Sequence, residues 1–436
     1  MSKRILLLSS VSPRFSAGLV ADYVLALEKA GFSVDILTKY KSESYQGKLI
    51  SAYDIEEPIR KCEVVVPSKS LFKKILLLLY TKISNGLFAN SVRKNCIFPY
   101  VHIEEYDYPI SSSMYIDKLE QNYDAVFVLY MQYMFTEQSL RDIYAKLHVP
   151  IYAFTIDMYL MTGACYYPGK CMGFEMGCKK CPGGDMKFQE MVKTHFIQKK
   201  RIYEDIGLKL IGNTWVERFF KQSFATKNCY FYNRQIIINE NVFSVKDKLE
   251  SRKNFNIPPG KRFVLLAGVA NNTPRKGFKY LVKAVNLFYD SLSVRERNEV
   301  VLMLIGRGAE NLVKQFKMDL FVTGFLDVES LSLAYSSSDV FISPSLDDAG
   351  PSMVNQALMC GTPVVSFNIG TALDVIREGE TGYVVDIKNY RAMACALFKL
   401  FKMPLKQQQE MRTNCRHLSM ELSSIESASL FFKSII

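Results

Sequence analysis

The stretch from Pro344 to Phe367, PSLDDAGPSMVNQALMCGTPVVSF, decides the fold that we expect for this chain. It predicts the end of a buried strand, a loop, a helix that opens near Pro351-Ser352, and a second buried strand. Pro is tolerated at a first helical position, and the Ser hydroxyl can accept a free backbone N–H there. In open α/β sheets, helix N-termini at the carboxyl edge hold ligands, and phosphates above all. The alternative is an ordinary βαβ unit without a ligand, and geometry alone favours neither.

The composition is that of a globular chain large enough for two domains. It has 436 residues, of which 49% are hydrophobic and 22% are charged. A net charge of +12 indicates an anionic partner, which could be a nucleotide, a phospholipid surface or a nucleic acid. The apolar run Ile5–Leu8 is too short for a signal peptide, and no run approaches the ~18 residues of a membrane span. We therefore expect a cytoplasmic protein whose ten cysteines are mostly reduced thiols.

Strand and helix patterns alternate along both halves of the chain. The first half opens as a βαβ unit over residues 4–37, without the G-x-G-x-x-G of a dinucleotide site. The second half repeats the alternation more regularly, after a turn-rich, lysine-rich connection at 239–261. The predicted fold class is therefore α/β, with two Rossmann-like, doubly wound domains that face each other across a cleft. We place the N-terminal domain at 1–240 and the C-terminal domain at 241–419.

Residues 64–103 form a basic and apolar segment. They include six lysines and arginines and no Asp or Glu, and their apolar residues concentrate at 71–80. Such a segment is typical of an element that lies on an anionic membrane surface. A core helix with a solvated basic face is the alternative, and only the complete absence of acidic residues favours the membrane.

Four cysteines lie within seventeen residues, at Cys165, Cys171, Cys178 and Cys181. The last two form a C-x-x-C followed by Pro-Gly-Gly, and thiolates at this density suit tetrahedral zinc. The alternatives are reduced thiols that order a loop by packing, or a redox-labile pair. A zinc ion held here would be structural and not catalytic.

Arg275 and Lys276 follow the predicted strand that ends at Gly268, at the start of the next helix. Arg offers a bidentate fork and Lys a point charge, so the pair can clamp a diphosphate. Two solvated basic side chains are the alternative. The second anion-suited helix start, at Ser352, favours a ligand that the two sites share.

Five motifs of the second half, in their order and spacing, resemble the nucleotide-sugar domain of family 4 retaining glycosyltransferases, which have the GT-B fold. They are R-K-G-F at Arg275–Phe278, V-L-M-L-I-G at Val301–Gly306, Y-S-S-S-D-V-F-I-S-P-S at Tyr335–Ser345, A-L-M-C-G-T-P-V-V at Ala357–Val365 and T-G-Y-V at Thr381–Val384. The N-terminal half resembles, more narrowly, the enzymes of colanic-acid and capsular polysaccharide biosynthesis. That resemblance is carried by D-M-Y-x-x-T-G-x-C-Y-Y from Asp157, the cysteines after it, and the segment from Asn213 to Trp215. The last helix of the family crosses back to the first domain, which we expect here of residues 420–436.

The resemblance assigns roles to particular residues. Asp348 and Gln356 stand at the family's acid pair, so Asp348 would contact the donor sugar and Gln356 the ribose, with an amide in place of a carboxylate. Arg275 and Lys276 would offset the charge of the departing diphosphate and so act in catalysis. The predicted donor site also includes the backbone of Ser352 and Met353 and the glycines Gly18, Gly306, Gly324 and Gly350.

Two further positions depart from the family pattern. The Arg that often follows the first glycine of the second domain is replaced by Val269, and the N-terminal His that contacts the donor sugar has no counterpart at Val128–Met131. Together with Gln356, these departures favour an alternative function, a catalytically weak pseudoenzyme that binds nucleotide sugars.

The function that the resemblance implies is nevertheless that of a retaining hexosyltransferase. It would move a sugar from a UDP- or GDP-linked donor to a glycan or polyprenyl-diphosphate-linked acceptor in bacterial surface polysaccharide (capsule) biosynthesis. No catalytic metal is required by this chemistry, and the basic segment 64–103 would hold the protein at the inner membrane face. A nucleic-acid binder ranks a distant third, because only the net charge indicates it.

Overall fold

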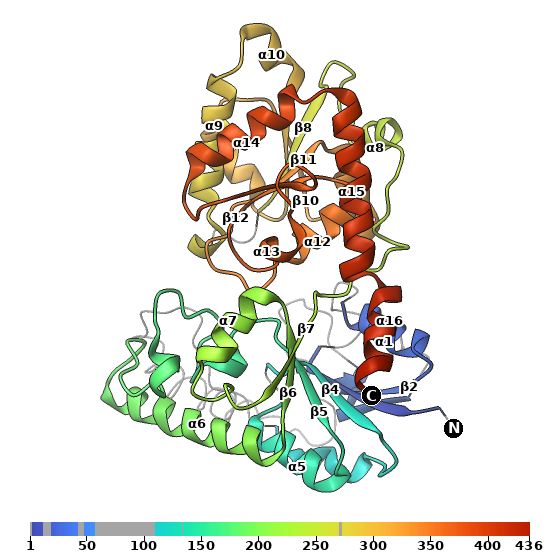
Figure 1. Ribbon diagram of the computed structural model, residues 1–436, viewed down its shortest axis with the longest axis vertical. Coiled ribbons are helices and arrows are strands. Elements are labelled where there is room, and N and C mark those ends of the chain that lie inside the picture. The colour runs from blue at the N-terminus through green and yellow to red at the C-terminus, as the bar shows by residue number, and fades with distance from the viewer. Residues whose placement is uncertain (1, 12–18, 42–47, 57–109, 133, 270–272) are drawn as a thin grey trace, which may run out of the picture. The chain divides into compact units, whose positions relative to one another are not determined.

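The chain forms two compact units, each built on one parallel sheet (Figure 1). The computed structural model describes residues 2–11, 19–41, 48–56, 110–132, 134–269 and 273–436. Unit 1 consists of Met1–Gly212, Val216–Asn233 and Phe432–Ile436, and unit 2 of Asn213–Trp215 and Arg234–Phe431. The predicted fold class, α/β with two doubly wound parallel-sheet domains, is confirmed.

In the part of the chain that the structure describes, unit 1 has seven parallel strands in the order β3-β2-β1-β4-β5-β6-β7. They are β1 (Arg4–Ser9), β2 (Ser33–Lys41), β3 (Lys48–Glu56), β4 (Ala125–Tyr130), β5 (Ile151–Phe154), β6 (Lys209–Gly212) and β7 (Tyr230–Asn233). The central strands β1 and β4 are buried along almost their whole length, as strands covered on both faces must be.

The helices of unit 1 come from both ends of the chain. They are α1 (Leu19–Lys29), α5 (Glu137–Leu147), α6 (Met186–Asp205), most of α7 (Thr214–Gln222) and the end of α16 (Ile425–Ile435). Phe432 packs edge-on against Phe127, with ring centroids 5.3 Å apart, and the Tyr152 hydroxyl donates to the Ile435 carbonyl over 2.7 Å. The C-terminus therefore returns to the first sheet, as predicted.

The return begins later than the predicted residue 420, because only Phe432–Ile436 belong to unit 1. The preceding helix α15 (Leu405–Ser423) packs on α12 (Ser352–Met359) of unit 2. Its buried positions Met411, Cys415 and Leu418 form a narrow apolar stripe on an otherwise polar helix. That stripe keeps α15 with the second unit.

The sheet of unit 2 has the strand order β10-β9-β8-β11-β12-β13. Its strands are β8 (Phe263–Gly268), β9 (Val300–Ile305), β10 (Leu320–Gly324), β11 (Val340–Ser343), β12 (Val364–Phe367) and β13 (Gly382–Val385). Leu265 of β8 pairs in parallel with Leu302 of β9 on one side and with Val340 of β11 on the other. The strand order reverses at β8, so the carboxyl ends of β8 and β11 diverge there and leave room for a ligand.

Helices cover both faces of this sheet. Figure 1 shows α9 (Phe278–Asp290) and α14 (Tyr390–Lys402) on one side, and α8 (Lys248–Asn254), α12 and α15 on the other. The contacts agree with this layering: α9 packs on α14, and α11 (Val328–Ser337) packs on both α8 and α12. The short helices α10 (Val294–Glu299) and α13 (Ala372–Val375) complete the unit.

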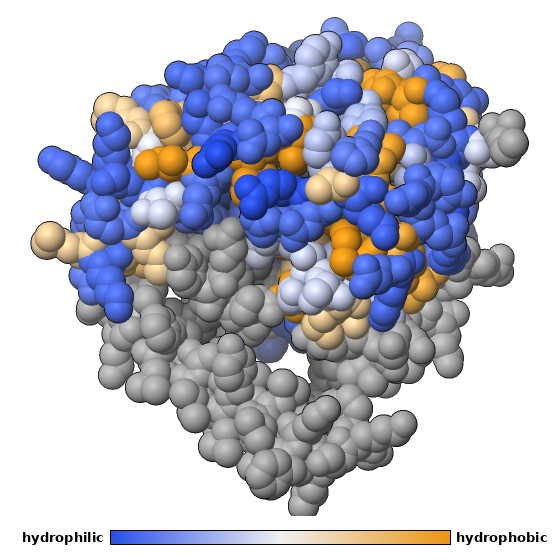
Figure 2. All heavy atoms as spheres, turned by 90° about the horizontal axis from the view of Figure 1, so that it is seen from below, coloured by the Kyte–Doolittle hydropathy of each residue, from blue (hydrophilic) through white to orange (hydrophobic). Residues whose placement is uncertain are grey.

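Within the described ranges, no helix combines the length and the apolar composition that crossing a bilayer requires. On the face shown in Figure 2, the apolar side chains of these residues gather in several small patches separated by hydrophilic ones. The basic segment 64–103 lies outside the described residues, and so does Gly18.

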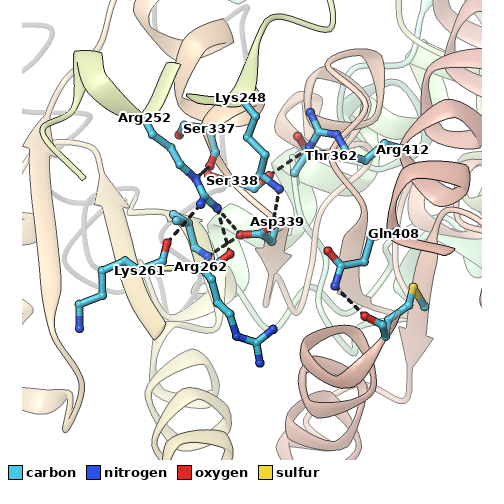
Figure 3. Close-up of polar contacts among 12 residues, drawn as sticks. Lys248, Arg252, Lys261, Arg262, Ser337, Ser338, Asp339, Thr362, Gln408 and Arg412 are labelled. Carbon is cyan, nitrogen blue, oxygen red and sulfur yellow. Dashed lines mark hydrogen bonds and ion pairs between the residues drawn. The ribbon is translucent and has the colours of Figure 1, made fainter. Parts of the chain in front are cut away.

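A buried carboxylate fastens α8 to the amino edge of the unit 2 sheet (Figure 3). The side chain of Asp339, directly before β11, is 5% exposed and accepts hydrogen bonds from Arg252 Nη2 over 2.7 Å and from the Val264 backbone N–H over 2.6 Å. The Lys248 ammonium binds its second oxygen, and burial lowers the pKa of that lysine. One carboxylate thus neutralises two cations and joins β8, β11 and α8.

We expect Asp339→Asn to lower the free energy of unfolding by about 3 kcal/mol, because it leaves two partly buried cations without their counter-charge. The matched control is Asp290→Asn, which removes an exposed ion pair with Lys317 and should cost at most about 0.5 kcal/mol. Urea unfolding of both variants beside the wild type measures the difference. Equal losses in the two variants would contradict the bracing role.

Candidate functional site

A cavity of about 320 Å³ opens at the carboxyl edge of the unit 2 sheet. The ends of β8, β9 and β11 form its floor, the residues after β10 form one wall, and the start of α12 forms another. The wall that follows β10 is apolar and includes Phe325, Leu326 and Leu331, with Ile305 beside it. Lys276 brings a cation to the same cavity. An apolar wall next to a cation suits a ligand that has a flat apolar end and an anionic end.

Close backbone contacts bring the two loops of the site together. Gly277 has a left-handed backbone, with φ of 66°, and a Cβ at this position would lie 1.8 Å from the carbonyl oxygen of Pro344. The Leu346 N–H donates to the carbonyl of Arg275 over 2.6 Å. Only glycine permits this approach, so the turn that carries Arg275 and Lys276 rests directly on the loop after β11.

The three residues predicted for catalysis lie together. Lys276 Nζ is 2.5 Å from Asp348 Oδ2, and Arg275 Nη1 is 3.3 Å from the same oxygen. Arg275 Nη1 also donates to the backbone carbonyl of Asp347 over 3.1 Å. Asp348 is almost fully buried, with 6% of its side chain exposed. Its carboxylate therefore neutralises part of the charge that the two cations would offer to an anion.

The start of α12 faces the cavity without a side-chain cap. Ser352 is the first helical residue and Pro351 is the N-cap, so the predicted capping role of the Ser352 hydroxyl is wrong. The proline side chain cannot accept a hydrogen bond, and the first turn contains no acidic residue. Pro351, Ser352 and Met353 all line the cavity. The positive end of the helix dipole is thus left available to an anion.

Among the glycines predicted for the donor site, Gly306 alone lines the cavity within the described residues. Its φ is 120°, and a Cβ there would meet the Val269 carbonyl oxygen at 2.2 Å, so it lets the ends of β8 and β9 come close. Gly324 ends β10 with φ of 68°, and the Gly350 N–H donates to Asp348 Oδ1 over 3.4 Å. Neither of these two is part of the cavity wall.

Gln356 is half-buried on α12, outside the cavity lining. Its side-chain oxygen accepts a hydrogen bond from the Tyr335 hydroxyl over 3.1 Å. Burial raises the pKa of Tyr335 far above its ordinary value, so this hydroxyl keeps its proton and donates. Gln356 thus has a fixed partner on α11, and its predicted contact with a ribose stays a prediction.

Sequence analysis did not predict the apolar wall of the cavity. Phe325 is 70% exposed, although it is a large apolar residue, and the Arg307 guanidinium lies 5.4 Å from its ring centre. The apolar pair Phe325-Leu326, directly after the glycine that ends β10, could have indicated this wall. A turn at that place usually continues with polar residues. An exposed aromatic ring at a cavity rim is a typical binding element.

The four clustered cysteines are free thiols in unit 1. Cys178 and Cys181 are buried, Cys178 has a left-handed backbone with φ of 52°, and burial raises its pKa to about 11. Over the described ranges, no three side chains of His, Cys, Asp or Glu are gathered so that they could hold a metal ion. The geometry therefore adds no support to the structural zinc, which stays a prediction from the spacing.

A buried ionic cluster in unit 1 was also missed. His195 Nε2 and Lys199 Nζ lie 3.1 Å and 3.2 Å from the two carboxylate oxygens of Glu137, and all three side chains are at most 1% exposed. Lys199 Nζ also donates to the carbonyl of Tyr159 over 2.8 Å, and His195 Nδ1 lies 2.7 Å from the carbonyl of Gly163. Although burial opposes it, the charges of Lys199 and His195 lower the pKa of Glu137. The cluster fastens the loop that follows β5.

We expect Glu137→Gln to lower the free energy of unfolding at pH 7 by about 3 kcal/mol, because it leaves the Lys199 charge buried without its partner. The folded-state pKa of Glu137 lies below its unfolded value of about 4.3, so its stabilisation is present above that pH and is lost as the pH falls through the folded value. The gap between wild type and variant should therefore narrow in acid. Urea unfolding across this pH range measures it.

Glu190→Gln is the matched control for that experiment, because Glu190 makes an exposed ion pair with Lys193. It should cost at most about 0.5 kcal/mol at any of these pH values. A Glu137→Gln variant as stable as the control at pH 7 would contradict the role of the cluster.

Comparison with known proteins relates the second half of the chain to glycosyltransferases. Residues 247–418 match the family model described as Glycosyl transferases group 1. A D-inositol 3-phosphate glycosyltransferase of Arthrobacter sp. is 31% identical over 156 residues, which are 33% of this chain and 35% of the relative. A GDP-mannose-dependent alpha-mannosyltransferase of Corynebacterium glutamicum is 26% identical over 140 residues, 30% of this chain and 33% of the relative. The chain thus spans about a third of the length of these curated relatives.

Solved structures match the whole chain at low sequence identity. Sucrose-phosphate synthase from Thermosynechococcus elongatus gives a TM-score of 0.62 at 16% identity, with 99% of this chain and 98% of that one covered. Anabaena HepE, solved with UDP and glucose, gives 0.60 at 11% identity with the same coverage, and TarM gives 0.61 at 12% with 100% and 98% covered. These matches show that the chain has the GT-B fold that we predicted. The narrower resemblance to colanic-acid and capsular enzymes stays a prediction.

Proposed function

We propose that the protein is a glycosyltransferase that binds a nucleoside-diphosphate sugar in the unit 2 cavity. The observation that carries this proposal is the combination of an apolar wall, a cation and an uncapped helix start around one cavity of about 320 Å³. The match of residues 247–418 to group 1 glycosyltransferases supports it, because the whole cavity lies within that range.

The diphosphate would bind between Lys276 and the start of α12. The N–H groups at Ser352 and Met353 offer an uncapped helix terminus, and Lys276 offers a full charge in the same cavity. In the structure the Lys276 ammonium is paired with Asp348. A diphosphate that takes over Lys276 would leave the carboxylate of Asp348 free to accept hydrogen bonds from sugar hydroxyls.

The nucleobase would lie against the apolar wall. Phe325, Leu326 and Leu331 provide an apolar surface for a flat ring in the cavity. Among the solved structures that share this fold, HepE contains UDP, which supports a nucleotide of the UDP type. The related mannosyltransferase of C. glutamicum is named for GDP-mannose, so a GDP-linked donor stays equally open.

Transfer would proceed with retention of configuration and without a protein nucleophile. The bond between the sugar C1 and the diphosphate oxygen breaks, and its electrons stay with the diphosphate. The acceptor oxygen bonds to C1 on the same face and gives its proton to an oxygen of the leaving phosphate. Arg275 and Lys276 would stabilise the negative charge that develops there, an electrostatic role that requires no metal.

The acceptor and the place of the reaction are further parts of the proposal. A glycan on a polyprenyl diphosphate carrier at the inner face of the membrane would suit a bacterial surface polysaccharide or capsule. The basic segment 64–103, whose charge would attract anionic lipid, supports this location through its sequence alone.

A thermal-shift panel of UDP, GDP and their glucose and mannose sugars tests the donor site. We expect one nucleotide family to raise the melting temperature by about 4 °C or more at a concentration 100-fold above its Kd. Lys276→Ala should abolish the shift, because it removes the cation that faces the diphosphate. The control is Lys279→Ala, which removes an exposed lysine outside the cavity lining and should leave the shift unchanged. A shift that survives in Lys276→Ala would refute the proposed clamp.

The predicted contact between the Gln356 amide and the ribose can be tested with nucleotides that have or lack the ribose hydroxyls. We expect Gln356→Glu to raise the affinity for UDP or GDP about 3-fold to 10-fold, because a carboxylate accepts ribose hydroxyls more strongly than an amide does. The affinity for the 2′,3′-dideoxy nucleotide should not change, since it lacks both hydroxyls. Isothermal titration of the two ligands decides the point, and equal changes for both would show that Gln356 is not at the ribose.

The pseudoenzyme is the second candidate, and Gln356 and the missing N-terminal His favour it by their departure from the family pattern. A protein that binds a nucleotide sugar but neither transfers nor hydrolyses its sugar would support it. Release of UDP or GDP from the bound sugar nucleotide, dependent on Lys276, would support the transferase instead.

A further inference from the structure

A buried hydrogen-bond network of unit 2 lies against the loop that carries Asp348. Asn213 Nδ2 donates to the backbone carbonyl of Ala349 over 2.5 Å, and these two residues are 5% and 2% exposed. The next residue, Thr214, donates its backbone N–H to Asp374 Oδ2 over 3.1 Å. The carbonyl that follows Asp348 is thus held by a side chain that lies 136 residues away in sequence from the residue it binds.

The network continues through three more side chains. Gln235 Nε2 donates to Asp374 over 2.6 Å, and the Thr371 hydroxyl is 2.5 Å from Gln235 Oε1 and 3.2 Å from Asn355 Oδ1. The Thr371 hydroxyl has a single proton, which it donates to Gln235 Oε1 in the shorter contact. The longer contact is satisfied if the amide of Asn355 is turned so that its nitrogen faces Thr371, which also gives the buried Asn355 Nδ2 the partner that it otherwise lacks.

The loop has little freedom between these supports. Gly370 has φ of 57°, and a Cβ there would lie 2.7 Å from the carbonyl oxygen of Asp348. A Cβ at Gly350 would lie 3.2 Å from Asn213 Nδ2. The backbone from Asp348 to Gly350 is therefore held between the turn at Gly370 and the Asn213 amide, and a shift at either support displaces it.

Two residues of the network, Asn213 and Gln235, lie at the points where the chain enters unit 2. Asn213 directly follows Gly212, the last residue of β6 in unit 1, and Gln235 lies one residue after Arg234, where the chain enters unit 2 again. Neither residue belongs to the range 247–418 that matches the glycosyltransferase model. The donor loop thus depends on two polar side chains that the matched part of the chain does not contain.

We infer that Asn213 is a positioning residue of the donor site, which sets the place of the Asp348 carboxylate by holding the Ala349 carbonyl. The inference rests on the proposed function of the unit 2 cavity. Loss of the bond leaves a buried carbonyl unsatisfied, so the loop must move to find another partner. Because Asp348 would contact the sugar, such a movement changes sugar binding and transfer.

Loss of the Asn213 hydrogen bond should affect the binding of the nucleobase and the diphosphate differently from the binding of the sugar. Neither Phe325 nor Lys276 is on the loop between Asp348 and Gly350, but Lys276 is paired with Asp348. Because a diphosphate would compete with Asp348 for Lys276, a displaced loop leaves the affinity for the free nucleoside diphosphate unchanged or raises it. This split distinguishes positioning from a general loss of stability, which would weaken both.

The experiment compares Asn213→Ala and Asn213→Asp with the wild type. Asn213→Asp keeps the size of the side chain but replaces the donor by an acceptor that faces the Ala349 carbonyl, so it should be at least as harmful as Asn213→Ala. The control is Asn286→Ala, because the amide of Asn286 also donates to a backbone carbonyl, that of Gln315 over 2.9 Å, at an exposed site of the same unit.

Two readouts are needed. Hydrogen exchange of the amides at 347–351 requires no ligand, and we expect protection to fall about 10-fold in both Asn213 variants and not in Asn286→Ala. Hydrolysis of UDP-glucose or GDP-mannose, whichever the wild type accepts, should fall about 10-fold to 100-fold in kcat, with the Kd of UDP or GDP unchanged or lower.

Unchanged exchange in Asn213→Ala would overturn the inference, as would equal losses of nucleotide affinity and kcat. An Asn213→Asp variant that behaves like the wild type would also overturn it, because the donated hydrogen bond would then have no role. A wild-type protein that binds neither UDP, GDP nor their sugars would refute the proposed function, and this inference with it. The exchange experiment, which needs no nucleotide, tells the two failures apart.

Discussion

The contact between Gly277 and Pro344 is the constraint on which the candidate site depends. A side chain at position 277 would enter the space of the Pro344 carbonyl, so the chain can place a cationic turn on the loop after β11 only with glycine there. That contact sets the distance between Lys276 and Asp348. Lys276, from the β8–α9 connection, thus meets Asp348 of the β11–α12 connection and lines one cavity with the start of α12.

Charge balance follows from this packing. Asp348 is buried beside two cations, and it is stable there because Arg275 and Lys276 compensate its charge. A ligand diphosphate would compete with Asp348 for the same cations, so anion binding and release of the carboxylate are linked. The buried cluster of Asp339, Lys248 and Arg252, which stabilises unit 2, lies away from this site, at the opposite, amino edge of the sheet (Figure 3).

The strand pattern of unit 2 could be predicted more closely than its helix ends. The strand predicted to end at Gly268 does end there, because strands buried on both faces appear as continuous apolar runs between polar turns. Ser352 was expected to cap α12, whereas it is the first helical residue and Pro351 stands at the N-cap position without a capping hydrogen bond, since cap geometry depends on the dihedral angles of the incoming loop. Helix α15 was not predicted, because its apolar stripe is too narrow to stand out from its polar sequence.

By itself, the sequence determined the two parallel-sheet units, the strand, loop and helix from Pro344 to Phe367, and the cations at Arg275 and Lys276, because each depends on neighbours within a few turns of chain. Only the tertiary structure decided which of these residues meet. Lys276 and Asp348 are 72 residues apart, and Asn213 and Ala349 are 136 apart. Periodicity has no information over such separations, whereas the crossovers of a doubly wound sheet bring successive carboxyl ends to one edge.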